Sequence, residues 1–360
     1  MSATIPPSPP KAKAERKVPN YRQQLKKVLP PEYLEPEYGN LAWFLVHFAI
    51  IGAGFYALHN YFSYWMALPV ALVIGHSFAC MGFLGHDVCH GGAVKNIALR
   101  DLLAGVAFSP LWIGPYLWRR WHNGEHHGNT QVEGVDPDHL FTIEHYRNSA
   151  ILRFLYFIPP IFRNLIIFSS FSYRMTQQSM RMWGTYMLSP KSTAHEKWTL
   201  FWQWLLPLAF WVTVSSMLGV NVFVWGYFVP LLVGNAIAIS YIVTNHFLNP
   251  LDEPDEADPL SHSLSVTLPK WLSFLDPWHQ YFGAHVAHHM FPMAPAKHAR
   301  QIEAKIAELW PDRYHVMPIM TALKLLWQTP WVYEDKTTLL DPNRQERAGT
   351  LGHGLDVPKK

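Results

Sequence analysis

Residues 41–85 read LAWFLVHFAIIGAGFYALHNYFSYWMALPVALVIGHSFACMGFLG, without one Asp, Glu, Lys or Arg. A helix that crosses a bilayer needs about 20 apolar residues, so this stretch is long enough for two helices. His59, Asn60 and Tyr61 mark the turn between them. The stretch therefore predicts a membrane hairpin with spans at about 41–59 and 61–85.

A second stretch, residues 198–251, is equally free of charge and has a turn at Gly219, Val220 and Asn221. It predicts a second hairpin with spans at about 199–218 and 222–247. The composition agrees, because 49% of the residues are hydrophobic and only 15% are charged, against about 25% in an ordinary soluble chain. We therefore expect an all-α integral membrane protein with four transmembrane helices.

The remaining segments lie outside these hairpins. Residues 1–35 combine prolines with lysines and show no apolar face, so we expect a mobile arm. Residues 36–335 form the membrane domain, in which the amphipathic segment 296–310 belongs to a helical cap. Residues 336–360 are polar and we expect a loosely held tail. Segment 151–171 is apolar but contains Pro159, Pro160, Arg153 and Arg163, which indicates interfacial helices and not a fifth span.

The basic residues predict the orientation. Loops rich in Lys and Arg stay in the cytoplasm, and here basic residues crowd residues 11–27 and the segment between the two hairpins, while both hairpin turns carry no charge. The arm, the central segment and the C-terminal segment should therefore share the cytoplasmic side. The net charge of +3 is too small for a nucleic-acid surface, so we expect no nucleic-acid partner.

Histidine is the one extreme of the composition, with 20 residues. Three clusters, HDVCH at 86–90, HNGEHH at 122–127 and HVAHH at 285–289, have spacings that place imidazoles on one helix face. All three clusters fall on the predicted cytoplasmic side. The candidate ligands are His86, His90, His122, His126, His127, His285, His288 and His289.

Eight imidazoles exceed the ligands that one ion takes, so two metal ions are implied. Imidazole suits zinc, copper, iron and nickel, and the spacing does not choose among them. His246, at the end of the fourth span, is a ninth candidate, and the neighbouring Asn245 could hold a water ligand. Asp87, Glu125 and Asp138 are candidate acceptors for the second N–H of a ligand imidazole.

Other functions fit the same residues less well. A metal transporter should place its ligands near the bilayer midplane, whereas these clusters follow the span ends. A membrane haem held by His47 and His76 is conceivable, although a hydrogen bond between helices is the commoner role for such residues. Cys80 and Cys89 are the only cysteines, and no Cys-x-x-Cys occurs for an iron–sulfur or rubredoxin site.

The order and spacing of the clusters on two hairpins resemble the integral-membrane fatty acid desaturase and hydroxylase superfamily over roughly residues 40–330. Gly85, His86 and Asp87 followed by His90 and Gly91 are similar to the first histidine box of acyl-lipid desaturases, and residues 285–292 to the third. The resemblance implies a non-haem di-iron centre with two Fe²⁺ ions, held by the eight box histidines together with His246. It also implies dioxygen as co-substrate.

The resemblance leaves the reaction open among three outcomes. Fatty acid desaturation is the function we expect, and hydroxylation or oxidative decarboxylation of free medium-chain fatty acids to terminal alkenes are the alternatives. Front-end desaturases carry a fused haem domain and Gln at the start of the third box, where this chain has His285. That difference argues against front-end desaturation.

Partners and location follow from the same resemblance. The substrate should be a fatty acid or acyl lipid in the bilayer. Because the chain shows no electron-carrying module, an external donor is needed, which could be a ferredoxin, a rubredoxin or a small cytochrome. We favour the bacterial inner membrane over the endoplasmic reticulum, with the active site facing the cytoplasm.

Overall fold

The computed structural model describes residues 20–253 and 258–355, and this part of the chain is mostly helical. Four of its helices are long and apolar enough to cross a membrane, which confirms the number expected. They are α2 (Ala42–Asn60), α3 (Tyr64–His90), α9 (Ala194–Met217) and the continuous run Val220–His246, made of α10 (Val220–Val222), the π-helical Phe223–Phe228 and α11 (Val229–His246).

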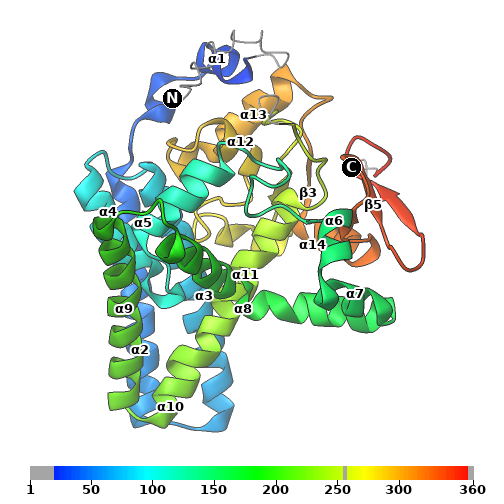
Figure 1. Ribbon diagram of the computed structural model, residues 1–360. Coiled ribbons are helices and arrows are strands. Elements are labelled where there is room, and N and C mark those ends of the chain that lie inside the picture. The colour runs from blue at the N-terminus through cyan, green and yellow to red at the C-terminus, as the bar shows by residue number, and fades with distance from the viewer. Residues whose placement is uncertain (1–19, 254–257, 356–360) are drawn as a thin grey trace, which may run out of the picture.

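Both hairpins point the same way (Figure 1). Their turns are adjacent, since His59 Nδ1 lies 2.8 Å from the carbonyl oxygen of Leu218. Helix α3 begins with a Ser63 cap, whose hydroxyl accepts from Met66 N–H, and it ends at Gly91 in the left-handed conformation. Only residues that tolerate positive φ end a helix in this way, and glycine does so without strain. The ends of α3 and α11 lie together, at the side of the bundle opposite the two turns.

Small residues let α3 and α11 pack closely at the centre of the bundle. A Cβ added at Gly75 would lie 2.5 Å from Val233 Cβ, and one added at Gly234 would lie 3.1 Å from Phe78 Cβ. Small residues at such positions are the usual means by which membrane helices approach each other, because apolar burial does not drive their association in lipid. This contact holds the last turns of the two helices side by side.

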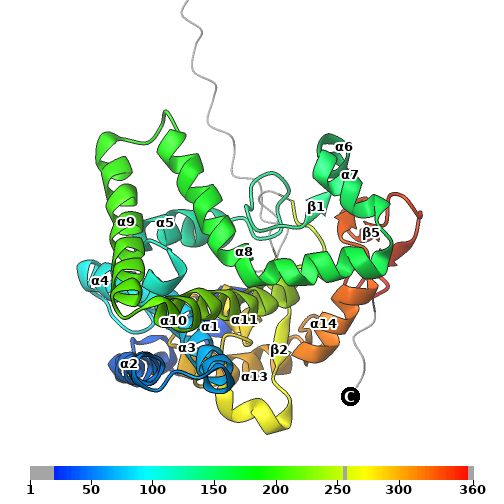
Figure 2. The same ribbon diagram turned by 90° about the horizontal axis from the view of Figure 1, so that it is seen from below.

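The segment between the hairpins builds one wall of the cap. Its elements are α4 (Ile97–Phe108), α5 (Pro115–Trp118), the π-helical Arg119–His126, β1 (Phe141–Thr142), α6 (Ile143–Asn148), α7 (Ala150–Phe157) and α8 (Pro160–Leu188). Neither α7 nor α8 is among the candidate spans, although α4 and α5 with their flanking turns form a pair bent by 96° that would pass as a broken span. Figure 2 shows α8 alongside α11 and reaching α14 at its other end.

The C-terminal segment and α1 (Tyr21–Lys26) complete the cap. The elements are β2 (Ser265–Thr267), α12 (His285–Met290), α13 (Ala299–Leu309), β3 (Val316–Pro318), α14 (Ile319–Gln328), β4 (Val332–Tyr333), β5 (Thr338–Leu340) and β6 (Arg347–Gly349). Together with β1, the C-terminal strands form two small sheets. One has the order β1-β4-β5-β6, and the other is the parallel pair β2-β3, in which Ser265 lies opposite Val316. An all-α description is therefore incomplete.

The C-terminal segment differs from the loosely held tail that we expected. Residues 338–349 form a hairpin whose Leu339 is buried, and Leu351 N–H donates to the Leu248 carbonyl at 2.9 Å. Asp341 pairs with Arg163 of α8 at 2.5 Å, and both side chains are at most 5% exposed. These long-range partners are not visible in the local polarity of the segment. Residues 356–360 lie outside the described part.

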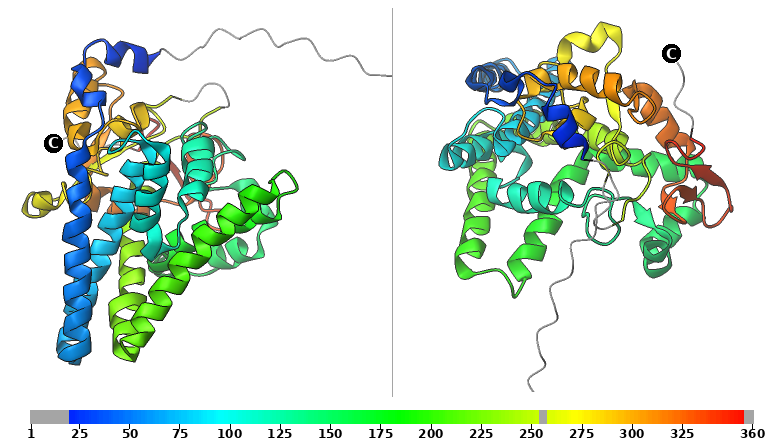
Figure 3. Two further views of the ribbon diagram at one scale, coloured as in Figure 1. Left: turned by 90° about the vertical axis from the view of Figure 1, so that its left-hand side faces the viewer. Right: turned by 90° about the horizontal axis from the view of Figure 1, so that it is seen from above.

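The N-terminal arm also differs from the expectation over the residues that are described. Tyr21, Leu25 and Leu29 follow the spacing of one helix face, and all three are buried. They pack against Val286 and Ile302 of the cap. Figure 3 shows α1 at the cap end, above the start of α2. The remainder of the predicted arm, residues 1–19, lies outside the described residues.

Candidate metal centre

The first histidine cluster lies at the end of α3. His86 and His90 are separated by one helical turn and face the same side, with ring centroids 4.7 Å apart. Both side chains are buried. His86 Nε2 lies 3.0 Å from His122 Nε2, so the first and second clusters meet.

The second cluster is shaped by a π-helical turn over Arg119–His126. His127 N–H donates to the His122 carbonyl at 3.0 Å, which is the i to i+5 bond of a π-helix. In an α-helix two residues five apart face different sides, whereas the wider turn brings His122 and His127 to one side, with Nε2 atoms 3.2 Å apart. His126 is left to face another direction.

The third cluster, on α12, divides between two groups of imidazoles. His288 Nε2 lies 3.0 Å from His127 Nε2, whereas His285 Nε2 lies 2.8 Å from His246 Nε2 and 3.1 Å from His289 Nε2. We call the two groups set A and set B. Set A is His86, His90, His122, His127 and His288, and set B is His126, His246, His285 and His289. All nine imidazoles named from the sequence therefore lie in one of two adjacent groups.

The chemistry of set A fits a metal ion. One nitrogen from each of its five imidazoles lies within 4.8 Å of the others. Burial, helped by the neighbouring imidazoles, lowers the pKa of His122, His127 and His288 well below the usual range, so these rings are neutral. His90 Nε2 is buried without a hydrogen-bond partner. Neutral nitrogen atoms that converge in this way are the donors that a transition-metal ion requires.

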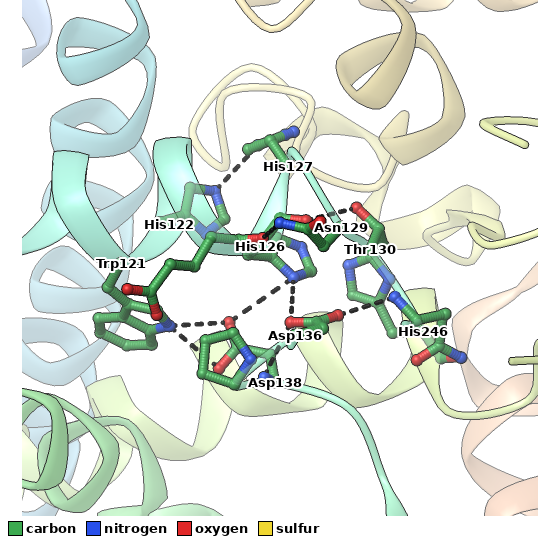
Figure 4. Close-up of polar contacts among 12 residues, drawn as sticks. Trp121, His122, His126, His127, Asn129, Thr130, Asp136, Asp138 and His246 are labelled. Carbon is green, nitrogen blue, oxygen red and sulfur yellow. Dashed lines mark hydrogen bonds and ion pairs between the residues drawn. The ribbon is translucent and has the colours of Figure 1, made fainter. Parts of the chain in front are cut away.

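Three imidazoles of set B, those of His126, His246 and His289, are oriented by acceptors at Nδ1. His246 Nδ1–H donates to the His262 carbonyl at 3.3 Å, and His126 Nδ1–H donates to Asp136 Oδ1 at 2.9 Å (Figure 4). The Thr130 hydroxyl donates to the His126 carbonyl, so it accepts from His289 Nδ1–H at 3.3 Å. Each contact leaves the Nε2 lone pair free for a metal, which is the usual arrangement behind ligand histidines.

Asp136 is the residue of this site that the sequence did not reveal to us. Its carboxylate also accepts the backbone N–H of Gln131 and of Asp138, and it is 2% exposed. Burial opposes a charge on His126, but the Asp136 carboxylate outweighs it and raises the pKa of His126. The sequence did contain an indication of this acceptor, because two carboxylates, Asp136 and Asp138, follow shortly after the HNGEHH cluster.

The other proposed acceptors have different partners. Asp87 accepts from Asn40 Nδ2 at 2.9 Å and from Ala296 N–H at 3.2 Å, so it joins α3 to the cap. Glu125 is half-buried and accepts from the Tyr186 hydroxyl at 2.7 Å. Asp138 accepts from the Trp121 indole and lies 3.9 Å from His126 Nδ1 (Figure 4). Asn245 is fully buried beside His246, and neither of its side-chain amide atoms has a hydrogen-bond partner among the residues that the structure describes.

The two histidines of the spans have different partners. His76 Nε2 lies 2.9 Å from His279 Nε2, and His47 has no hydrogen-bond partner among the described residues. Both rings contact Trp278 instead, at 5.8 and 6.1 Å. This arrangement does not form the axial pair that a haem between His47 and His76 requires.

Replacing Asp136 with asparagine should lower both metal content and turnover. The amide is a weaker acceptor and can leave His126 in the wrong tautomer, and loss of such a partner costs about 10- to 100-fold in affinity or activity. Metal analysis and turnover of purified protein measure the effect. Glu125→Gln, which changes a carboxylate outside both sets, is the matched control. Equal activity of the Asp136 variant and the wild type would contradict this role.

The sequence is similar to known proteins over most of its length. Residues 63–320 match the family model described as fatty acid desaturase. The sn-1 acyl-lipid omega-3 desaturase (ferredoxin) of Synechocystis sp. is 27% identical over 86% of this chain and 88% of its own length. The protein of the same name from Nostoc sp. is 22% identical over 88% and 87%. A Delta(12) fatty acid desaturase of Calendula officinalis is 22% identical over 83% and 85%.

The family match covers α3, the second hairpin and all three histidine clusters. Enzymes of this kind are oxidoreductases of lipid metabolism, and the four apolar helices agree with a membrane protein. The chain belongs to the fatty acid desaturase family.

Proposed function

We propose that this protein desaturates fatty acyl chains at a centre of two iron ions, one held by set A and the other by set B, with dioxygen as co-substrate. The observation that supports this most is the convergence of nine buried or half-buried imidazoles, from α3, the π-helical turn, α11 and α12, into two adjacent groups. When bound, such irons supply the oxidising power needed to attack an unactivated C–H bond.

The protein's own residues provide the place for the acyl chain. A pocket beside set A is lined by Phe83 and Phe282 and by two imidazoles of the set, His86 and His288. The two aromatic rings offer apolar surface to a hydrocarbon chain, and the imidazoles bring the metal to the wall of the pocket. Position along this pocket then selects the carbon that reacts, since orientation decides which bond is attacked.

Two further features complete the site. The Trp118 ring stacks on His122 with centroids 4.3 Å apart, and Phe282 contacts His86 at 5.0 Å. These rings keep water away from set A. On the other side, the unpartnered amide of Asn245 suits a water molecule that completes the ligands of set B.

Electrons must come from another protein. The relatives from Synechocystis sp. and Nostoc sp. are named as ferredoxin enzymes, and we propose a ferredoxin as the donor here too, ahead of a rubredoxin or a small cytochrome. The basic segments flanking the hairpins favour a cytoplasmic position for the cap and its site, in a bacterial inner membrane.

Purified under reducing conditions after growth in iron-rich medium, the protein should contain about two irons per chain. The two imidazole sets each hold one ion, because five and four nitrogen ligands satisfy separate coordination spheres. Metal analysis by mass spectrometry measures the ratio, and a His126→Ala variant should keep about half. Stoichiometric zinc in place of iron would contradict the redox centre.

Expression in a bacterium of known lipid composition tests the reaction. With ferredoxin and its reductase supplied, the membrane lipids should gain acyl chains lighter by two hydrogen atoms. Terminal alkenes from added medium-chain free acids would instead assign decarboxylation, and chains heavier by one oxygen would assign hydroxylation. Unchanged lipids from an iron-loaded, reducible protein would reject acyl-chain oxidation altogether.

A further inference from the structure

A further group of residues that can bind a metal lies away from sets A and B. It consists of His76 and Cys80 of α3 and His279 of the loop before α12, which we call the inner cluster. His76 Nε2 lies 2.9 Å from His279 Nε2 and 3.7 Å from Cys80 Sγ. One ligand atom from each residue lies within 4.8 Å of the others. Cys80 is fully buried and His279 is 5% exposed.

The inner cluster is separate from the proposed iron centre. His76 precedes His86 by ten residues on α3, which corresponds to about 15 Å along a helix. Phe83 and Phe282, stacked with centroids 4.6 Å apart, lie between the two places. Phe83 contacts His279 at 5.6 Å, while Phe282 contacts His86 at 5.0 Å. Ligands of one centre therefore do not reach the other.

The distances suit a metal ion. An ion held by three ligands in one plane, with bonds of about 2.0 Å to nitrogen and about 2.3 Å to sulfur, places its ligand atoms about 3.5–3.7 Å apart. The 3.7 Å gap between His76 Nε2 and Cys80 Sγ matches this range, and the 2.9 Å gap between the two imidazoles must widen by about 0.6 Å when the ion binds. Within sets A and B the corresponding nitrogen–nitrogen gaps are 2.8 to 3.2 Å. The His76–His279 gap therefore falls within the range of the two proposed iron sites.

One proposed ligand of the inner cluster, His279, also has a hydrogen-bond partner at its Nδ1. The Tyr241 hydroxyl lies 2.9 Å from His279 Nδ1, and it is buried on α11. When Nδ1–H donates to Tyr241, the Nε2 lone pair of His279 faces His76 and is free for a metal. Three imidazoles of set B are held in the same way.

We propose that the inner cluster binds one soft metal ion, copper(I), through His76 Nε2, Cys80 Sγ and His279 Nε2. Thiolate ligands select soft ions such as copper(I) and zinc. Two neutral imidazoles and one thiolate carry a single negative charge, so copper(I) makes a neutral complex, whereas zinc leaves a net positive charge. A neutral complex is favoured inside an apolar bundle, because burying a charge there is costly.

The bound ion would act as a structural clamp. His279 lies six residues before His285, so an ion shared with α3 fixes the loop that leads into the third histidine cluster. Cys80 loses its thiol proton to solvent when the ion binds, and no change of oxidation state is involved. The proposal stands on the inner cluster alone and does not depend on which reaction the iron centre performs.

Titration of the iron-loaded, full-length protein with buffered copper(I), under anaerobic conditions, tests the proposal. We expect the wild type to bind one equivalent of copper beyond its iron, with a thiolate-to-copper absorption band in the near ultraviolet. Cys80→Ser should lose both the equivalent and the band while keeping its iron. Cys89→Ser, the same change at the only other cysteine, should keep both.

Two results would overturn the inference. One is a wild type that binds no more copper than the Cys80→Ser variant. The other is a band that disappears with Cys89→Ser and survives Cys80→Ser. In either case His76 and His279 are a hydrogen-bonded pair, in which one imidazole N–H donates to the other ring. Serine differs from cysteine by one atom, so the fold of the variant is retained, and its iron content and elution profile verify this.

Discussion

Replacing His288 with alanine should reduce acyl-chain oxidation to less than about one hundredth of the wild-type rate, because even residues behind a ligand imidazole contribute about 10- to 100-fold. His288 Nε2 lies 3.0 Å from His127 Nε2 within set A, so the substitution removes one of the proposed metal ligands. His126→Ala should have the same effect through set B. Both variants should still enter the membrane, since the four apolar helices do not depend on the metal.

His195→Ala is the control for these variants, because His195 is exposed at the start of α9 and lies outside both sets. Turnover is measured by mass spectrometry of fatty acid products, and iron is measured on the same preparations. Full turnover of the His288 variant would remove that residue from the proposed ligands. Loss of activity in the His195 variant would point to a general loss of folding instead.

Engineered cysteines should fall into two classes. An impermeant reagent should label one class from outside the cell and the other only after permeabilisation. The native Cys80 and Cys89 are buried, so an impermeant reagent reports on engineered cysteines. Asn60 and Val220, at the hairpin turns, should react from outside the cell. Asn148 and Glu346 should react only after permeabilisation, because the charge-free turns and basic flanks predict a cytoplasmic cap.

Glu346 is preferable to Asp341 for this purpose, since Asp341 is buried against Arg163 and a cysteine there would break the pair. Labelling of Asn148 and Glu346 from opposite sides of the membrane would contradict the four-span arrangement. In that case an additional span would lie between residues 148 and 346, and His86 could not share set A with His288. Labelling of both positions from outside the cell would instead identify the bent pair formed by α4 and α5 with their flanking turns as a fifth span.

Several features of the site followed from local sequence. Membrane spans depend on the length of an apolar run and on the absence of charge, which are properties of a stretch and not of its contacts. That is why two charge-free stretches predicted four helices. The i and i+4 spacing of His86 and His90 likewise places both rings on one face of any helix. The structure brings all nine predicted imidazoles together.

Other features depended on partners far along the chain. The π-helical turn that brings His122 and His127 together needs packing to stabilise its wider turn, so the sequence did not reveal which imidazoles share an ion. Asp87 was a plausible acceptor beside His86, yet it binds Asn40 and Ala296. Asp136 took that role for His126 because the loop after the second cluster folds back onto it.

The sequence by itself thus determined a membrane protein with two helical hairpins and three histidine clusters, since hydropathy and helical periodicity act over a few turns. Only the tertiary structure decided how the nine imidazoles divide between sets A and B, because that division depends on contacts between α3, α11 and α12. It also decided that residues 338–351 pack against the cap. A polar segment with buried long-range partners cannot be told from a free tail by composition, because its stability comes from those partners.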